Sequence, residues 1–363
     1  MELWNVHEGV TAVVGAQYRF NIVGRVDDPG NTLALSCRLN GGDWSPVAVN
    51  LSGGPKARLR SPGDFNIDAF KVEELLSDNV IEVRQTRRGL PEVRRVVAFG
   101  ASQPPLAEPD FELSLGNGKA EEYCQVVDGH WRVVHDGQGP ALVIDPADAG
   151  YDRIALFGHR QWTTGYEVDA CISVDRWTNY VHNVGVLFKW NPHRLGRAGR
   201  LPTEWTTGLA YYASTSPGLR VRFGDDVRFD DEGRKLGDQV LAERPVNGWG
   251  TLPRWLLRGT WHLSGRRLVL SQLRPGVPYR YRVRVDPAAY SLSVWRAGRP
   301  EPRPQIVVVG PTEVLASGSV GVIAQNAAAR VHSFRVRSLG SGNCSDVSNV
   351  PDARSSTGGY QSS

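Results

Sequence analysis

The last third of the chain alternates apolar and polar residues in four successive segments. These are Tyr279–Val285, Tyr290–Trp295, Ser319–Gln325 and Val331–Arg337. Successive side chains of a β-strand point to opposite faces, so this period of two indicates strands with one buried and one solvated face. Breaks that contain proline, such as Asp286-Pro287 and Gly310-Pro311, separate the segments and turn the chain. The pattern predicts a run of antiparallel strands.

The length and one proline-rich stretch predict two domains. A chain of 363 residues exceeds what one hydrophobic core usually organises. Residues 102–109 contain three prolines and predict a stiff linker between a domain of residues 1–101 and one of residues 110–339. Residues 340–363 lack apolar periodicity, which predicts a disordered tail.

The first hundred residues show the same alternation in shorter segments, which predicts a small β-sandwich. Three phrases there, at Asn21–Val26, Leu39–Gly42 and Gly63–Asn66, read Asn-Ile-x-Gly-x-Val, Leu-Asn-Gly-Gly and Gly-Asp-Phe-Asn. By these phrases the segment resembles bacterial immunoglobulin-like modules. The resemblance implies a spacer or support beside a carbohydrate-active or surface domain, so we assign this part no chemistry.

Alternation in the middle of the chain predicts further strands of the larger domain. Residues Tyr166–Asp175 separate into an apolar face and a polar face that carries Glu167 and Asp169. The next segment, Tyr180–Trp190, is apolar at every second position from Val184, with Trp190 in the same phase. Two more strands are predicted at Gly208–Ser214 and Leu219–Phe223.

This strand order, with its Gly-Val-Leu-Phe-x-Trp phrase and a closing Phe-Arg-Val-Arg strand, resembles the concanavalin A-like (laminin G-like) jelly-roll superfamily. It is similar to the family that hydrolyses 3-keto-disaccharides and to carbohydrate-binding modules. The Glu-x-Asp-x-x-Glu strand of glycoside hydrolases that share this sandwich is absent, so no catalytic pair transfers from them. The predicted fold class is all-β, an immunoglobulin-like sandwich followed by a larger concanavalin A-like jelly roll.

The charge and hydropathy of the chain indicate which binding partners and which cellular compartment to expect. The net charge of +4 comes almost entirely from arginine that alternates with apolar residues, which indicates solvated strand faces and no nucleic-acid groove. A face that binds a uronate or a sulfated sugar stays open as an alternative. No stretch approaches the roughly 20 apolar residues of a membrane helix, so we expect no membrane partner. The N-terminus has neither a basic region nor an apolar run, which predicts a cytoplasmic protein unless a leader was removed.

Two pairs of residues are candidates for catalysis. Glu167 and Asp169 lie two positions apart on one strand face, which places their carboxylates roughly 6–7 Å apart, near the range used in glycoside hydrolysis. A solvated outer face explains the same spacing. In a lyase, His182 would remove a sugar proton and Tyr212 would return one. Hydrogen bonding at a strand end explains this histidine equally.

Aromatic residues are the candidates for ligand binding. Trp205, Trp249 and Trp255 fall in glycine-containing or polar segments that predict loops, where flat rings suit stacking against sugars. Tyr211 and His193 are the neighbouring ligand candidates. Burial in the sandwich core is the alternative for each tryptophan, and we expect Trp190 and Trp295 to be core residues.

The sequence predicts no metal site. The four cysteines have no C-x-x-C spacing and no two histidines have chelating spacing, so we expect neither zinc nor a disulfide scaffold. The acidic run 225–233 leaves calcium as an alternative, but it lacks the ligand spacing of a calcium loop and favours a solvated hairpin tip.

Three functions follow from these patterns. The first is recognition of a glycan or glycoside on the concave face and loops of the larger sandwich, with hydrolase or lyase activity left open. The second is an enzyme, a lyase or cyclase, that acts on a hydrophobic small molecule in the same cleft. The third is a non-catalytic structural or adhesion protein. The oligomeric state is not predicted, and the fold alone does not decide among these functions.

Overall fold

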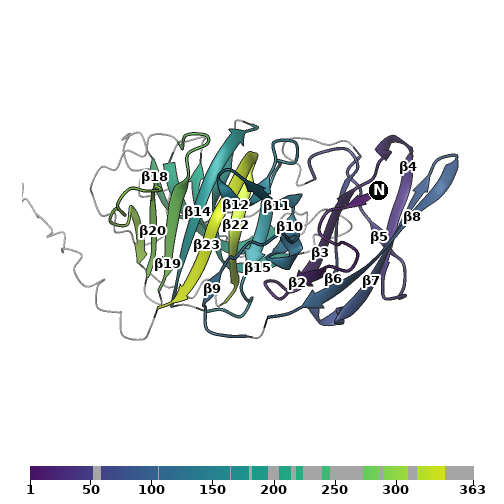
Figure 1. The fold of residues 1–363 in the computed structure, drawn as a ribbon, viewed down its shortest axis with the longest axis horizontal. Coiled ribbons are helices and arrows are strands. Elements are labelled where there is room, and N and C mark those ends of the chain that lie inside the picture. Colours follow the sequence, from purple (N-terminus) through teal and green to yellow (C-terminus); the bar gives the residue numbers. More distant parts are fainter. Residues whose placement is uncertain are drawn as a thin grey trace, which may run out of the picture.

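The computed structural model describes residues 1–51, 59–104, 106–163, 165–179, 182–194, 204–213, 218–223, 239–245, 273–286, 289–309 and 317–339. Within these residues the regular elements are β-strands and three short 3-10 helices, η1 (Pro29–Asn31), η2 (Val72–Glu74) and η3 (Ala120–Glu122). The prediction of an all-β fold built from sandwiches is confirmed. Figure 1 shows the smaller, N-terminal part at one end of the molecule and the larger part beside it.

The strands up to residue 102 form two sheets that face each other, and we call them the first sandwich. Its three-stranded sheet has the order β1 (Glu2–Leu3), β3 (Arg19–Arg25), β6 (Asp64–Lys71). Its five-stranded sheet has the order β2 (Thr11–Val13), β8 (Leu90–Ser102), β7 (Asp78–Arg87), β4 (Thr32–Leu39), β5 (Ser45–Val47). The alternating residues of both sheets meet in one core that includes Phe20, Phe65 and Ile81.

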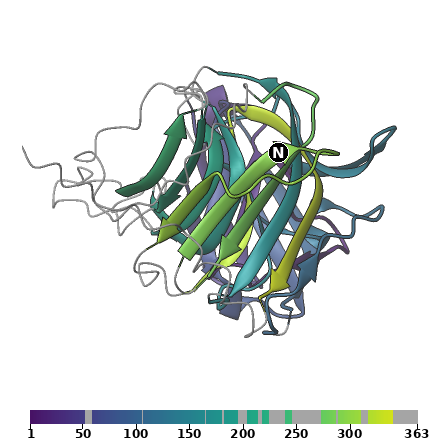
Figure 2. The ribbon, with the colours of Figure 1, turned by 90° about the vertical axis from the view of Figure 1, so that its left-hand side faces the viewer.

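The later strands form two larger sheets, the second sandwich. The seven-stranded sheet has the order β10 (Gln125–Asp128), β13 (Arg153–Phe157), β22 (Ser319–Gln325), β15 (Asn183–Arg194), β16 (Glu204–Ala213), β17 (Gly218–Phe223), β18 (Gln239–Pro245). The eight-stranded sheet has the order β11 (Trp131–Asp136), β12 (Gly139–Ile144), β23 (Ala327–Ser338), β14 (Tyr166–Trp177), β19 (Tyr279–Val285), β20 (Ala289–Arg296), β21 (Ile306–Val309), and β9 (Phe111–Glu112) pairs with β23. Figure 2 shows the long, twisted strands of this sheet edge to edge.

One face of each large sheet packs into the core between them. On β14, Tyr166, Val168 and Ala170 are fully buried there, while Glu167 and Asp169 point away from the core. The same alternation on β19 buries Tyr281 and Val283 and turns the intervening arginines outward. Period-two alternation therefore decides which residues of the eight-stranded sheet are left on the surface.

A bulge in β15 places Trp190 on the opposite face of the sheet from the one that its spacing predicts. Val184, Val186 and Phe188 point into the core between the sheets, as their alternation predicts. Lys189 has a positive φ of 49°, and the pairing of β15 with β22 shifts register between Leu187 and Trp190. A bulge reverses the phase of the residues that follow it. Trp190 is buried as expected, but it lies on the opposite face of the sheet from Val184.

That opposite face carries a second apolar cluster that the first sandwich helps to cover. The cluster consists of Ala16, Val127, Ile154, Leu156, Leu187, Trp190, Tyr211 and Ile323. Ala16 belongs to the first sandwich, and Trp190 Nε1 donates a 3.0 Å hydrogen bond to Gln17 Oε1 beside it. The outer face of the seven-stranded sheet is therefore part of the contact between the sandwiches.

Buried amides complete this contact. Gln125 Oε1 accepts hydrogen bonds from the backbone N–H groups of Ala16 (2.9 Å) and Gln17 (3.2 Å). Asn66 Nδ2 donates to the carbonyl oxygen of Val127 and to Asp128 Oδ1, both at 2.7 Å. A buried polar group is costly unless it is hydrogen-bonded, so these matched pairs hold the sandwiches in one arrangement.

The described part of the chain has three buried cysteines. Cys37, Cys124 and Cys171 are buried free thiols in the described part of the chain, and burial raises the pKa of Cys37 to about 12. No helix within the described residues has the length and hydropathy needed to span a membrane.

Candidate functional site

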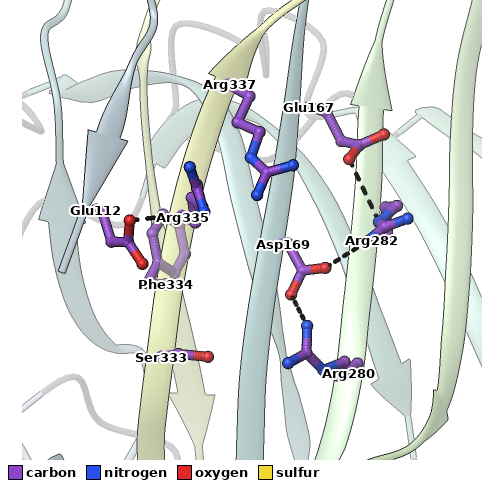
Figure 3. Close-up of a pocket in the computed structure, with 9 residues that line it drawn as sticks. All are labelled: Glu112, Glu167, Asp169, Arg280, Arg282, Ser333, Phe334, Arg335 and Arg337. Carbon is purple, nitrogen blue, oxygen red and sulfur yellow. Dashed lines mark hydrogen bonds and ion pairs between the residues drawn. The ribbon is translucent and has the colours of Figure 1, made fainter. Parts of the chain in front are cut away.

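A shallow depression of about 300 Å³ lies on the outer surface of the eight-stranded sheet. We call the outward side chains of β14, β19 and β23 the charged face. It comprises Glu167, Asp169, Arg280, Arg282, Arg284, Arg335 and Arg337. Figure 3 shows Arg335 and Arg337 on one strand, the two carboxylates on the next and Arg280 and Arg282 on the third. Glu112 and Ser333 complete the polar lining, whereas Phe334 has its side chain in the core.

The two carboxylates of β14 turn toward the arginines of β19. Asp169 Oδ1 accepts a 2.9 Å hydrogen bond from Arg280 Nη1, and Asp169 Oδ2 accepts one of 2.7 Å from Arg282 Nη2. Arg282 Nε also lies 3.3 Å from Glu167 Oε1, and Arg282 forms a further ion pair with Glu301. Arg282 therefore forms ion pairs with three carboxylates, and its hydrogen bonds orient two of them, Asp169 and Glu301.

Arg335 and Arg337 of β23 form fewer ion pairs than the arginines of β19. In the strand pairing Arg337 stands opposite Glu167 and Arg335 opposite Asp169, yet neither forms an ion pair with its neighbour. Arg335 Nη1 lies 3.6 Å from Glu112 Oε2, and this carboxylate is largely exposed. Arg335 Nε is buried and has no hydrogen-bond partner among the residues that the structure describes. No ion pair joins Arg337 to a carboxylate in the described part of the chain.

A second depression, of about 330 Å³, adjoins the first along the sheet. It shares Glu167 and Arg282 with the first depression. Its other lining residues are Arg284, Asp286, Ala289, Ser291, Ser293, Glu301, Pro304 and Val307. The hollowed surface therefore extends from β23 across the sheet to β20, and its second part includes the apolar residues Ala289, Pro304 and Val307.

Trp295 lies beneath this surface. Its side chain is on the outer face of β20, where Trp295 pairs with Arg280, and the Arg282 guanidinium carbon lies 5.6 Å from the ring centroid. Trp295 is buried, as expected, but it belongs to no apolar core cluster. An arginine held over an aromatic ring loses side-chain freedom, so Trp295 helps to preorganise Arg282.

Burial and charge act on Glu167 in opposite directions. Partial burial raises the pKa of this carboxyl above its ordinary value, and nearby Arg282 offsets only part of the effect. The neighbouring carboxylates Glu301 and Asp169 raise the pKa further. Glu167 is therefore the member of the pair that takes up a proton more readily than an exposed glutamate.

His182 and Tyr212 lie elsewhere. The His182 ring stacks on Trp177 at 4.0 Å between centroids, and Trp177 lies 6.2 Å from the ring of Tyr212. His182 Nδ1 donates to the carbonyl oxygen of Asn179 at 2.6 Å, and burial lowers the pKa of His182. Tyr212 points into the core between the sheets, and burial raises its pKa. The structure thus places Glu167 beside Asp169 on the outer face of the eight-stranded sheet, whereas His182 and Tyr212 each lie near the ring of Trp177, away from these carboxylates.

The ligand candidates are only partly described. Tyr211 points to the outer face of the seven-stranded sheet and is buried in the cluster with Trp190. Trp205 and His193 belong to β16 and β15 by their backbones. Trp249, Trp255 and the acidic run 225–233 lie outside the described residues. No group of three or more His, Cys, Asp or Glu side chains among the described residues is placed to hold a metal ion.

Sequence reasoning did not place Arg335, Arg337 or Trp295 in the site. Their signal was present, because arginines at every second position of two strands predict solvated faces. What the pattern lacked was the order of the strands. The pairing of β14 with both β19 and β23 brings the two arginine series to either side of Glu167 and Asp169.

No protein-family model matches the chain, and no curated protein matches it significantly. Among solved structures, the exoplasmic/lumenal domain of VIP36 in its Ca2+/Man3GlcNAc-bound form aligns with a TM-score of 0.36 and 11% identity, over 61% of this chain and 88% of that one. The GH43 protein BlXynB from Bacillus licheniformis aligns with a TM-score of 0.35 and 11% identity, over 88% of this chain and 62% of that one. These scores are too low to carry an argument about the present site.

Proposed function

We propose that this protein recognises a carbohydrate, and that the ligand lies on the charged face of the eight-stranded sheet. The observation that carries the proposal is the pair of adjoining depressions that share Glu167 and Arg282. Carboxylates accept hydrogen bonds and guanidinium groups donate them in fixed planes. Sugar hydroxyls do both, so a ring with several adjacent hydroxyls matches such a surface.

The polar lining also separates this function from its alternative. Pockets for apolar small molecules are lined mostly by hydrophobic and aromatic side chains. In the first depression every lining residue except Phe334 is polar, and Phe334 turns its ring into the core. This lining favours a hydroxylated ligand over a terpenoid-like one. The length of the two depressions together favours a ligand of more than one sugar unit.

A thermal-shift screen against a panel of oligosaccharides and apolar compounds tests the proposal, because a ligand that binds only the folded state raises the melting temperature. Calcium and a chelator form separate arms of the screen. Ser333→Tyr fills the first depression and is expected to abolish the shift. Thr86→Tyr, at an exposed position of the first sandwich, is the matched control. A sugar-induced shift that survives Ser333→Tyr unchanged, or a shift with apolar compounds alone, contradicts the proposal.

Glycoside processing is a second candidate, and one observation favours it. Asp169 accepts hydrogen bonds from two guanidinium groups, whereas burial raises the pKa of the neighbouring Glu167. A carboxyl group of raised pKa beside a second carboxylate fits the division of roles in carboxylate-pair hydrolases. Release of nitrophenol from nitrophenyl glycosides, and its loss in Glu167→Gln with retained binding, tests this candidate. Binding without turnover on any glycoside of the panel would leave the protein a lectin-like binder.

A further inference from the structure

The charges of the first depression are not balanced across its width. Its side toward β19 is neutralised, because Asp169 and Glu167 face Arg280 and Arg282. Its side toward β23 carries Arg335, whose ion pair among the described residues is with the exposed Glu112, and Arg337, which forms no ion pair with a described carboxylate. An exposed ion pair at 3.6 Å contributes little, so this side keeps most of its positive charge.

One buried donor on this side also lacks an acceptor. Arg335 Nε has no hydrogen-bond partner among the described residues, which is costly for a charged group. Arg337 is exposed beside it, and the hydroxyl of Ser333 lines the same depression. Residues two apart on one strand face lie about 7 Å from each other at their Cα atoms. Two long arginine side chains at this separation can converge on one anionic group between them.

We propose that the ligand is an acidic glycan, with its carboxylate or sulfate group bound by Arg335 and Arg337 and its hydroxyls by Glu167, Asp169 and Arg282. This inference rests on the proposed function and names the class of sugar. Guanidinium groups bind carboxylate and sulfate oxygens through paired, charge-assisted hydrogen bonds. The neutralised side contributes hydrogen bonds to uncharged parts of the same ligand, so the two sides have different tasks.

Three polymers with one backbone test the inference: dextran, carboxymethyl dextran and dextran sulfate. Affinity electrophoresis of the full chain is expected to show stronger retardation by at least one of the charged polymers than by dextran. The retardation by that polymer should weaken as salt is raised, since the contact is between charges near the surface. The two charged polymers distinguish carboxylate from sulfate.

Arg335→Gln/Arg337→Gln is the decisive variant, and Arg296→Gln/Arg299→Gln is its control, because it removes the same charge from exposed positions outside both depressions. We expect the first variant to lose about tenfold or more in affinity for the charged polymer, and the control to lose much less. Melting temperatures of both variants show whether they are folded.

The outcomes separate the two proposals. Equal losses in both variants would mean non-specific attraction to net charge and would overturn the inference. Neutral oligosaccharides from the wider panel that bind as tightly as acidic ones, with no effect of Arg335→Gln/Arg337→Gln, would overturn the inference and leave carbohydrate recognition intact. A failure of every glycan in both experiments would overturn both.

Discussion

The two sheets of the second sandwich have opposite kinds of outer face. That of the seven-stranded sheet is apolar around Trp190 and Tyr211, and Ala16 and Gln17 of the first sandwich contact it. That of the eight-stranded sheet is charged and carries the two depressions. One face contacts the first sandwich, and the other is left exposed to solvent. A strand with one polar face can leave that face exposed to solvent. A strand that is apolar on both faces must instead be covered on both sides by other parts of the protein.

Removal of Trp190 tests this contrast with the largest expected effect. Trp190→Ala empties a fully buried site and removes the donor to Gln17, so we expect a loss of ~3–5 kcal/mol in the free energy of unfolding. Trp295→Ala, on the charged face, is the matched comparison. We expect a clearly smaller loss in the free energy of unfolding, because the solvent side of this ring is covered by the long side chain of Arg282 and not by a second sandwich. Urea denaturation measures both. Equal losses in the free energy of unfolding would mean that the outer faces of the two sheets contribute equally to stability, which contradicts the contrast between them.

Asn66→Ala tests the polar part of the contact between the sandwiches. It leaves Asn21 Nδ2 without its acceptor and the Asp128 carboxylate without one of its donors. We expect a loss of ~1–3 kcal/mol, since buried partners are left unsatisfied. Asn31→Ala, at an exposed position of the first sandwich, should cost under about 1 kcal/mol. A small cost at both positions would show that the amides do not hold the sandwiches together.

Lys189 predicts a dependence of stability on pH. Burial lowers its pKa from 10.5 to about 8 in the folded protein. Between about pH 8 and pH 10.5, Lys189 binds more protons in the unfolded chain than in the folded protein. Lys189 therefore makes the free energy of unfolding rise with pH over this range. Buried tyrosines and thiols act in the opposite direction there, so the difference between the wild type and Lys189→Met isolates the lysine. The stability advantage of Lys189→Met at pH 7 should shrink toward pH 10, and an advantage that stays constant contradicts the lowered pKa.

The smallest effect is expected at Tyr281. Its hydroxyl lies in the core between the sheets and has no hydrogen-bond partner within the described part of the chain. Tyr281→Phe should therefore leave the free energy of unfolding unchanged or raise it by about 1 kcal/mol. Tyr166→Phe is the control, because the Tyr166 hydroxyl accepts a 3.2 Å hydrogen bond from the Lys189 backbone and its loss should destabilise. Thermal unfolding compares the two variants, and a clear destabilisation by Tyr281→Phe would show that this hydroxyl has a partner in solution.

The sequence predicted those features of the fold that depend on neighbouring residues. The bounds of β19 and β22 coincide with the predicted segments Tyr279–Val285 and Ser319–Gln325. Alternation is a local property, so it also placed Glu167 and Asp169 on one face. It failed at Trp190, because nothing in the pattern indicates that a lysine adopts a positive φ and reverses the phase.

The site itself was only half predictable. The carboxylate pair follows from spacing within one strand, whereas its arginine partners come from β19 and its other arginine neighbours from β23, more than a hundred residues further along the chain. Pairing over such separations is decided by the whole core and not by local pattern. The interaction of Arg282 with Asp169 and the unpaired state of Arg337 both depend on it.

The buried amides between the sandwiches also decide how the chain can be divided. Residues 102–109 look like a boundary where two independent domains could be separated. A cut there would expose Trp190 and its apolar neighbours on one fragment, and leave Asn66 and Gln17 on the other without Asp128 and Gln125. Exposed apolar patches promote association, and unpaired buried amides weaken the fold. The predicted linker would therefore join two parts that depend on each other, and each is expected to be less soluble or less stable alone than together.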